Sequence, residues 1–383
     1  MKVVHIGHIF MPPEHPSFEV VDFHPARWVL NLALAQKAHA SIEPELVVQV
    51  PGAQVNFEAV VEGIPVHYLA APKRLRSATF FAFDSARIAR CVKSLAPDLV
   101  HAHGTEDAYG LAAQRTGLPC VLTAQGLCFL VNREVPPPLL HRSRLVAWTE
   151  RRCLRNCRDV IAKSAYVADA LHQRYPELAV HRIPNTYDSR LESIREPKKE
   201  KNLFAFVGRF DPRKGIDLIC DALRMVRMKC PEARLDIYGD VPRRASDYEI
   251  EMKARLKDAL GEAVTFKGTV AAIEVARGIS RAQALVAPSL EEMFGNQVIE
   301  ALLVGTHVVV SDETAMAENV RRFGNGTIVA QRDALALAGE LERIINAETM
   351  ADGQAARARV VEAFGPGPVA RAHHDLYEEI QER

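Results

Sequence analysis

The chain has 383 residues, a length that predicts two domains rather than one ordinary hydrophobic core. Its 48% hydrophobic and 25% charged residues are typical of a soluble globular protein, and 48 Lys and Arg balance 48 Asp and Glu. This balance argues against a nucleic-acid partner, and the sequence has no apolar run of about 18 residues that could span a membrane.

Seven cysteines are scattered along the chain, and none of them forms a Cys-x-x-Cys pair. The spacing favours reduced structural thiols and gives no zinc site. The apolar run in the N-terminal MKVVHIGHIF is too short for a signal peptide. We therefore expect a cytoplasmic protein without a structural metal.

In chain order, short strand-like runs alternate with amphipathic segments of helical length, which predicts a parallel α/β sheet. In the first half, the predicted strands are 3–7, 46–50, 98–103, 120–124 and 159–164, and the predicted helices include 26–38, 84–96 and 142–157. A polar stretch, residues 189–202, follows them and is interpreted as a linker.

A second α/β series follows this linker. Its predicted strands are 203–209, 235–240, 264–268, 284–289 and 307–312, and its predicted helices include 332–350 and 369–383. We predict two Rossmann-like domains that face each other across a cleft: residues 1–188, completed by 366–383, and residues 189–365. In such sheets, ligands bind at the C-terminal ends of the strands.

Two cations lie in the stretch VGRFDPRKG, residues 207–215. Arg209 follows a predicted strand, and Lys214 precedes a helix whose apolar residues recur at helical spacing. Cations beside the free N–H groups of a helix start favour a diphosphate. The alternative is a basic turn in solvent.

Two carboxylates lie in EEMFGNQVIE, residues 291–300. Eight residues of helix rise about 12 Å, so Glu292 and Glu300 could accept hydrogen bonds from hydroxyl groups at the two ends of a nucleotide sugar. N–H groups of Phe294 to Gln297 would meet phosphate oxygens between them. The alternative is a solvated Glu292 and a Glu300 paired with an arginine.

In these motifs the chain resembles the large family of retaining, nucleotide-sugar-dependent glycosyltransferases of GT-B architecture. IPNTYD, VGRFDPRKGIDLICDAL, LDIYGD, VTFKGTV and PSLEEMFGNQVIEAL follow in the order of that family between residues 160 and 320. The resemblance implies that the final helix crosses back to the first domain. It also implies that the second domain binds the donor and that the first binds the acceptor.

The resemblance assigns roles to the matching positions. Arg209, Lys214 and Glu292 would be catalytic, with the two cations on the diphosphate and Glu292 on hydroxyls of the donor sugar. Other donor-binding positions would be Gly208, Lys267, Gly268, Phe294, Gly295, Asn296, Gln297 and Glu300. Glu300 would hold the ribose, and Lys267 and Gly268 would border the base. No cofactor or metal is implied, since the sequence has no Asp-x-Asp pair.

The chain departs from the family pattern in its first domain. The loop at residues 8–25 lacks the usual Gly-Gly turn, and an acceptor-binding loop is the favoured interpretation of its length. In TAQGL, Gln125 stands where the family commonly has His, and glutamine cannot titrate. Gln125, Gly126 and His103 remain candidates for the acceptor side, whereas His101 is interpreted as a core histidine.

The leading hypothesis is thus a metal-independent transfer of a sugar from a nucleoside diphosphate to an acceptor hydroxyl of a saccharide, a lipid-linked molecule or a small molecule. Arginines around Trp148 in residues 141–159 leave a weak peripheral membrane contact open, against a solvated helix face. The alternatives are a sugar-nucleotide epimerase or phosphorylase on the same scaffold and a non-catalytic sugar-nucleotide-binding protein.

Overall fold

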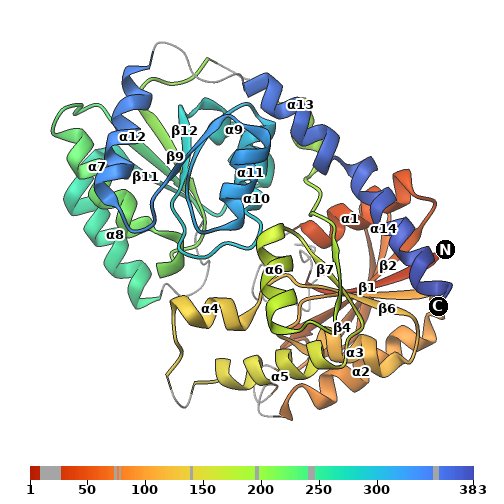
Figure 1. The fold of residues 1–383 in the computed structure, drawn as a ribbon. Coiled ribbons are helices and arrows are strands. Elements are labelled where there is room, and N and C mark those ends of the chain that lie inside the picture. Colours follow the sequence, from red (N-terminus) through yellow and green to blue (C-terminus); the bar gives the residue numbers. More distant parts are fainter. Residues whose placement is uncertain are drawn as a thin grey trace. The chain divides into compact units, whose positions relative to one another are not determined.

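The computed structural model describes residues 1–8, 27–72, 76, 79–138, 141–194, 198–239, 246–347 and 353–383. These residues divide into two compact units (Figure 1). Unit 1 comprises Met1–Asp188 and Phe364–Arg383, and unit 2 comprises Ser189–Ala363. Of the predicted loop at 8–25, only His8 lies within the described residues.

Unit 1 is built on an eight-stranded sheet with the order β3-β4-β2-β1-β5-β6-β7-β8. The strands are β1 (Lys2–Ile6), β2 (Glu43–Pro51), β3 (Phe57–Val61), β4 (Ile64–Ala71), β5 (Leu99–His103), β6 (Cys120–Thr123), β7 (Asp159–Ala162) and β8 (Ala179–Arg182). All neighbouring pairs are parallel except β3 and β4. The parallel strands therefore end together at one edge of the sheet.

Helices cover both faces of this sheet (Figure 1). They are α1 (Trp28–His39), α2 (Ala82–Ser94), α3 (Ala108–Thr116), α4 (Cys128–Glu134), α5 (Ser143–Arg155), α6 (Ala165–Arg174) and α14 (Pro366–Gln381). The last helix, α14, packs on α1 and brings Val369, Leu376 and Tyr377 into a core cluster with Val3 and Leu99. Unit 1 therefore buries side chains from both ends of the chain.

Unit 2 is built on a six-stranded parallel sheet with the order β11-β10-β9-β12-β13-β14. The strands are β9 (Leu203–Val207), β10 (Arg234–Tyr238), β11 (Val264–Gly268), β12 (Ala284–Ala287), β13 (His307–Ser311) and β14 (Gly326–Val329). The stretch HVVVS of β13 is buried throughout, as expected for a strand of a parallel sheet covered on both faces.

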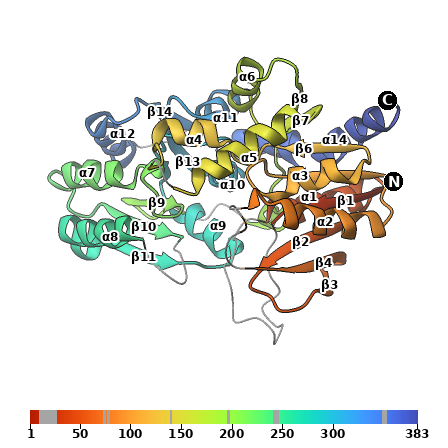
Figure 2. The same cartoon turned by 90° about the horizontal axis from the view of Figure 1, so that it is seen from below.

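The helices of unit 2 are α7 (Ile216–Arg227), α8 (Asp247–Leu260), α9 (Ala272–Arg281), α10 (Asn296–Leu303), α11 (Ala315–Phe323), α12 (Ala334–Asn346) and α13 (Gly353–Phe364). Figures 1 and 2 show α7, α8 and α12 close together, and their apolar residues share one core cluster with the sheet. No helix within the described ranges is both long and apolar enough to cross a bilayer.

The predicted strands of both halves are confirmed within a few residues, but three features were missed. They are the β3–β4 hairpin, β8 and β14. The polar stretch at 189–202 also differs from a free linker, because Leu191 and Ile194 are buried. Lys199 Nζ donates to Ser280 O and Thr306 Oγ1, both at 2.8 Å, so this stretch is anchored to unit 2.

Candidate functional site

The turn after β9 is shaped by the sequence DPRKG. The Asp211 side chain accepts a hydrogen bond from Arg213 N at 3.0 Å and caps the short 3-10 turn Pro212–Lys214. Gly215 follows with φ +68, and a Cβ there would collide with the carbonyl oxygen of Pro288. Only glycine allows the chain to approach the end of β12 this closely, and this approach places Lys214.

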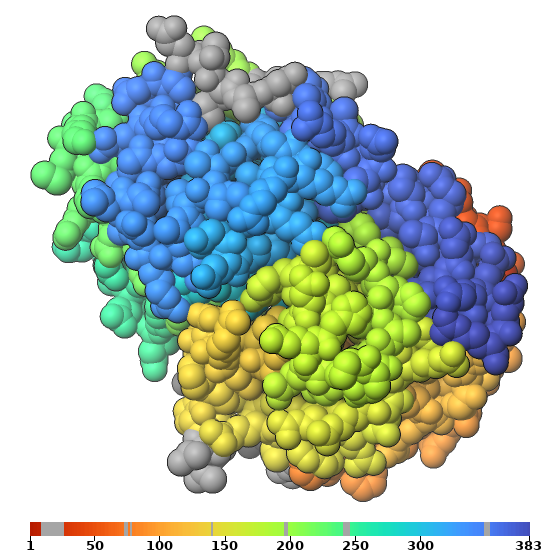
Figure 3. Space-filling model, viewed as in Figure 1, coloured from red at the N-terminus to blue at the C-terminus, as the bar shows by residue number. Residues whose placement is uncertain are grey.

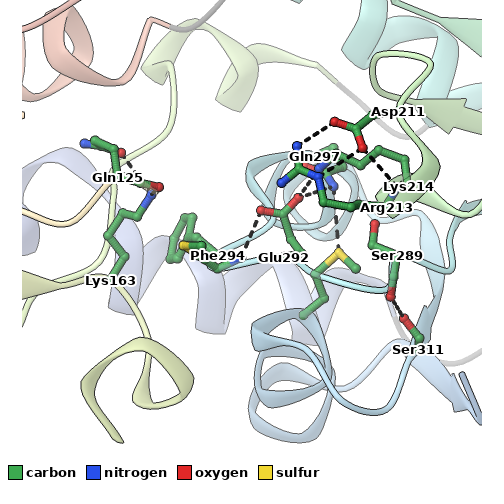
Figure 4. A network of polar contacts seen from close by, with 12 residues as sticks. Gln125, Lys163, Asp211, Arg213, Lys214, Ser289, Glu292, Phe294, Gln297 and Ser311 are labelled. Atoms are coloured by element: carbon green, nitrogen blue, oxygen red, sulfur yellow. Dashed lines mark hydrogen bonds and ion pairs between the residues drawn. The ribbon is translucent and has the colours of Figure 1, made fainter. Parts of the chain in front are cut away.

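Lys214 and Glu292 form an ion pair, with 2.6 Å between Nζ and Oε2. They come from different loops, 78 residues apart in sequence, and both side chains are less than one fifth exposed. Gln297 Nε2 lies 3.5 Å from the same carboxylate oxygen (Figure 4). The structure thus brings together three predicted site residues, from the turn after β9, the loop after β12 and helix α10.

The backbone around Glu292 is held from two sides. Ala315 N donates to Glu292 O at 3.0 Å, and Asn319 Nδ2 donates to Phe294 O at 3.0 Å. Gly295 has φ +80 and stands directly before α10, where a Cβ would collide with the Met316 side chain. The loop therefore enters α10 in one fixed conformation, with a glycine where another residue would be strained.

The N-terminal end of α10 carries the remaining predicted residues of this motif. Phe294 is only 2% exposed, so its ring is part of the core while its backbone belongs to the loop. Asn296 is the first residue of α10, and Glu300 lies half-buried one turn further along. The positive end of the helix dipole is thus located beside Lys214 and Glu292.

Arg209 differs from Lys214 in its surroundings. It is exposed and makes no hydrogen bond or ion pair with any residue that the structure describes. Its neighbour Asp211 is held by Arg213, with 3.0 Å from Nε to Oδ1 and 2.5 Å from Nη2 to Oδ2 (Figure 4). Burial alone would raise the pKa of Asp211, but the hydrogen bonds and charge of Arg213 outweigh it and lower that pKa. The charge of Arg209 also helps to lower the pKa of Asp211, so Arg209 lies near this carboxylate while its own side chain is exposed.

The glycines of the adjacent strands pack backbone against backbone. Gly208 N donates to Tyr238 O at 2.9 Å, and Gly239 N donates to Gly268 O at 3.0 Å. Lys267 Nζ lies 3.2 Å from Asp236 Oδ2, so this predicted base-bordering lysine has an acidic partner within unit 2. Gly208, Lys267 and Gly268 therefore line one sheet edge. Gly208 also lies beside Lys214, since a Cβ built on it would be 3.9 Å from Lys214 Cγ.

The acceptor-side candidates lie in unit 1, at the ends of β5, β6 and β7. Lys163 Nζ donates to Gln125 O at 3.0 Å and to Gln125 Oε1 at 2.9 Å (Figure 4). His103 is only 4% exposed, and its Nδ1 lies 3.5 Å from Gln125 Nε2. His101 is fully buried with both ring nitrogens hydrogen-bonded, as predicted for a core histidine.

Gly126 lies beside two acids, the half-buried Glu106 and the buried Glu150. Its carbonyl accepts a hydrogen bond from Thr105 Oγ1 at 2.9 Å, and Thr105 Oγ1 also lies 3.0 Å from Glu150 Oε2. Burial raises the pKa of Glu106, and it raises the pKa of Glu150 to about 7. Glu106 accepts a hydrogen bond from Thr105 N, and Glu150 accepts one from Cys128 N, so both acids hold loop backbone of unit 1. Neither acid was predicted from the sequence.

Two groups of described residues could hold a metal ion. One is His5, His101 and His103, and the other is His374, Asp375 and Glu378. Both groups lie in unit 1, and neither includes a predicted donor-binding residue. The absence of a metal from the reaction stays a prediction.

The basic helix α5 carries exposed arginines. They are Arg144, Arg151, Arg152 and Arg155. Trp148 is 44% exposed, and its ring centroid lies 4.5 Å from that of Phe80. Phe83, at the start of α2, is 77% exposed, and α5 contributes to the yellow surface in Figure 3. Exposed arginines beside exposed aromatic rings are the features that a peripheral membrane contact requires, and this contact stays a prediction.

The sequence missed the groups that support these sites. Asp211, Asp236 and Lys163 each hold a predicted residue or its neighbour, and Met316 packs under Gly295. A signal was present for Asp211, because Asp before Pro is typical of a helix start. No local pattern indicated the other three, since their partners are distant in sequence.

The comparisons with known proteins match both units. The glycosyl transferases group 1 family matches residues 189–361, and glycosyltransferase family 4 matches residues 26–191. The structure resembles sucrose-phosphate synthase from Thermosynechococcus elongatus, with a TM-score of 0.79, 22% identity, and coverage of 99% of this chain and 98% of that chain. It also resembles Anabaena HepE, solved in complex with UDP and glucose, with a TM-score of 0.73, 18% identity and 99% coverage of both chains.

Two sheets of this kind with these loops define the class of GT-B glycosyltransferases. Among curated relatives, a D-inositol 3-phosphate glycosyltransferase from Mycobacterium ulcerans is 26% identical over 351 residues, or 86% of this chain and 73% of the relative. A glycogen synthase from Mycobacterium tuberculosis is 29% identical over 293 residues, or 74% of this chain and 69% of the relative. The two matched families and these solved structures identify a GT-B glycosyltransferase, as predicted, and the α/β class with two parallel sheets is confirmed. The retaining mechanism stays a prediction.

Proposed function

We propose that the protein is a retaining, metal-independent glycosyltransferase that moves a sugar from a nucleoside diphosphate to an acceptor hydroxyl. The observation that carries this proposal is the Lys214–Glu292 pair, a cation and a carboxylate 2.6 Å apart beside the N-terminal end of α10. A nucleotide sugar needs both charges within a few ångströms, one for its phosphates and one for its hydroxyls. HepE, which has the same fold, was solved with UDP and glucose.

In the proposed mechanism, unit 2 holds the donor. Lys214 and Arg209 bind the diphosphate and stabilise the negative charge that develops as the sugar leaves. Glu292 accepts hydrogen bonds from the sugar, and Glu300 accepts them from the ribose. Backbone N–H groups at Phe294, Gly295 and Asn296 complete the cradle, at the positive end of α10.

No dedicated general base is assigned. In a retaining transfer on one face of the sugar, an oxygen of the departing phosphate takes the proton of the acceptor hydroxyl. The protein then needs to supply only fixed charges and positions, which is what Lys214 and its loop supply. Lys267 and Gly268 would border the base at the end of β11.

Unit 1 would hold the acceptor, with Gln125, Gly126 and His103 as the bordering residues. The relatives are named for inositol phosphate and glycogen, so their acceptors are polyols and saccharides. A further relative, from Mycobacterium leprae, is named a phosphatidyl-myo-inositol mannosyltransferase and matches 178 residues at 30% identity, 46% of this chain. We accordingly propose a polyol, saccharide or lipid-linked acceptor.

The first test is a thermal-shift panel with UDP, GDP, ADP, CMP and dTDP and their sugar conjugates. A ligand at about 100 times its Kd stabilises the folded state by about 2.7 kcal/mol. A shift with one diphosphate that is lost in Lys214→Ala and Glu300→Ala would support the donor site. No shift with any nucleotide would refute it.

The same ligand then separates the alternative activities. A transferase consumes the donor only when an acceptor is added, and EDTA leaves its rate unchanged if no metal takes part. An epimerase turns the donor over without an acceptor, and a phosphorylase requires inorganic phosphate. A protein that binds the donor and turns it over under none of these conditions is the non-catalytic alternative.

A further inference from the structure

Eight side chains of unit 1 form one continuous chain of hydrogen bonds. In order, they are Lys163, Gln125, His103, His5, Gln36, Tyr377, His101 and Thr123. They come from β1, β5, β6, α1, α14 and the loops that follow β6 and β7. Gln36, His5 and His101 are fully buried, so each polar atom of this interior depends on its neighbour in the chain.

The direction of the chain is fixed at its lysine end. The Lys163 ammonium can only donate, and it donates to Gln125 Oε1 at 2.9 Å. The amide nitrogen of Gln125 must then be the atom that faces His103 Nδ1, at 3.5 Å. His103 therefore carries its proton on Nε2 and donates it to His5 Nδ1 at 3.0 Å.

The same reasoning continues through the second half. His5 donates from Nε2 to Gln36 Oε1 at 2.8 Å, and Gln36 Nε2 donates to the Tyr377 hydroxyl at 2.9 Å. The Tyr377 hydroxyl passes its own proton to His101 Nδ1 at 2.6 Å. His101 then donates from Nε2 to Thr123 Oγ1 at 2.6 Å. All three histidines are thus neutral and hold their proton on Nε2.

Burial agrees with this assignment of neutral rings. It lowers the pKa of His5 to about 3 and holds the pKa of His101 and of His103 well below 6.5. The ligand atoms of these three rings lie within 4.8 Å of one another, close enough for a metal ion, and the rings of His101 and His103 stack at a centroid distance of 4.0 Å. The ring nitrogens of these three histidines already have hydrogen-bond partners, so a proton chain fits the cluster better than a metal site.

Three members of the chain line a small cavity of unit 1. Gln125, His103 and Thr123 share it with His373, together with Trp28, Leu32, Ile161, Ile183, Pro184, Asn185 and Thr186. His373 donates from Nδ1 to Val369 O at 2.8 Å, so its Nε2 is an acceptor. That nitrogen has no hydrogen-bond partner among the residues that the structure describes. The chain thus reaches a small cavity that His373 also lines.

We propose that Tyr377, on α14, is a positioning residue for the transfer reaction. Acting through Gln36, His5 and His103, it supports the orientation that Lys163 gives the Gln125 amide, with the nitrogen toward His103 and the oxygen toward Lys163. The assignment of a reaction to Tyr377 rests on the proposed function, in which Gln125 borders the acceptor. The direction of the hydrogen bonds rests on the structure alone.

Loss of the tyrosine hydroxyl has a defined consequence. Without its acceptor, the Gln36 amide can turn over and present its nitrogen to His5 Nε2. His5 and His103 must then move their protons to Nδ1, and His103 donates toward Gln125. In that reversed chain, the Gln125 amide nitrogen would face the Lys163 ammonium. Both groups are hydrogen-bond donors, so this contact is unfavourable. The Tyr377 hydroxyl can donate or accept, but by accepting from Gln36 it supports the direction that Lys163 fixes at the other end of the chain.

The test compares Tyr377→Phe with Tyr68→Phe. Tyr68 is a matched control because it is fully buried in the same unit, and its hydroxyl has no hydrogen-bond partner among the described residues. In protein labelled with ¹⁵N-histidine, long-range ¹H–¹⁵N spectra should show protonated Nε2 for His5, His101 and His103 in the native protein and in Tyr68→Phe. In Tyr377→Phe, we expect a second population with protonated Nδ1 at His5 and His103. Unchanged spectra would overturn the proposal, as would a Zn²⁺-induced shift of all three rings in the native protein.

The link to the reaction is tested by a double-mutant cycle with Gln125→Ala. Tyr377→Phe should lower kcat/KM for the acceptor about tenfold in the native background and have no further effect in Gln125→Ala. Two losses that multiply would overturn the positioning role, because a general loss of stability acts in both backgrounds. If Tyr377→Phe does not fold, Gln36→Leu breaks the same chain from α1. A protein that transfers no sugar would refute the proposed function, whereas the histidine spectra decide the hydrogen-bond chain independently.

Discussion

The two units place different chemistry at the ends of their strands. In unit 2 these ends carry charged side chains: the exposed Arg209, the half-buried pair Lys214 and Glu292, and the half-buried Lys267, which pairs with the buried Asp236 of β10. In unit 1 the ends of β5 and β6 carry neutral rings and amides, linked by directed hydrogen bonds and nearly closed to water.

This difference teaches how one scaffold can recognise two substrates. Fixed charge suits a diphosphate, whose identity is its negative charge. Directed hydrogen bonds suit a hydroxyl group, because they distinguish one hydroxyl of a substrate from its other hydroxyls by position and by donor or acceptor role. We therefore expect acid to act mainly on unit 1 and the removal of charged groups to act mainly on unit 2.

The largest effect is expected when acid challenges unit 1. Burial lowers the pKa of His5 to about 3 and of His373 to about 4, and it holds His101 and His103 well below a pKa of 6.5. As the pH falls through 6.5, these histidines become protonated in the unfolded chain but stay neutral in the folded unit. Stability is therefore lost, by about 2 kcal/mol for each histidine at pH 5. Glu150 opposes this loss, because its folded-state pKa of about 7 lets the folded unit gain one proton.

Urea unfolding at pH 7 and pH 5 measures this effect. Both tryptophans, Trp28 and Trp148, lie in unit 1, so tryptophan fluorescence reports on that unit alone. His373→Gln should reduce the loss of unfolding free energy between the two pH values by about 2 kcal/mol, because the variant has one buried neutral histidine fewer. An equal loss in the native protein and in His373→Gln would contradict the buried neutral histidine.

The second effect is on the rate of transfer. Lys214→Ala removes a cation from the leaving diphosphate, and we expect turnover to fall by about 10²–10³. Lys229→Ala is the matched control, since Lys229 is also ion-paired in unit 2 but is exposed, at 2.8 Å from Glu342. Near-native turnover of Lys214→Ala with its donor would remove Lys214 from the proposed mechanism.

A third experiment separates the two roles of the ion pair. Glu292→Gln frees Lys214 from its carboxylate, so a nucleoside diphosphate without sugar should bind about fivefold more tightly, while transfer becomes slower. Isothermal calorimetry of the diphosphate and rates with the nucleotide sugar measure the two effects. If the diphosphate binds more weakly, Glu292 is needed for the site's shape rather than for its sugar contacts.

The smallest effect concerns the surface of α5. Each basic residue near an anionic bilayer contributes about 1 kcal/mol to binding. Co-sedimentation with phosphatidylserine vesicles should therefore decrease about fivefold in Arg151→Gln, and further in Trp148→Ala. Vesicles of phosphatidylcholine alone are the control. Equal binding to both vesicles, or to neither, would leave α5 as a solvated face.

The sequence predicted what depends on local pattern. The runs LFAFV and HVVVS were assigned as strands because buried parallel strands are continuously apolar. The turn residues Gly215 and Gly295 lie in motifs that the charged residues, the helical periodicity and the family resemblance had indicated. The hairpin of β3 and β4 was missed because β3 is half-exposed, and its side chains give only a weak alternation.

Partners distant in sequence could not be predicted. Lys214 and Glu292 were both placed at strand ends, yet no pattern indicated that they pair with each other. Gln36 and Tyr377 are 341 residues apart, and their hydrogen bond depends on how α14 packs on α1. Such contacts are fixed by the register of packed elements rather than by the residues that flank each side chain.

The position of α14 has a consequence for how the chain folds during its synthesis. Unit 1 takes core side chains from the last residues of the chain, Val369, Leu376 and Tyr377, whereas unit 2 ends at Ala363. At the ribosome, the second unit can therefore complete its core before the first, although it is made later. Until α14 emerges, Gln36 and His101 lack their hydrogen-bond partner Tyr377, and the apolar core residues that α14 covers stay exposed. The nascent first unit is therefore the part of the chain that a chaperone would bind.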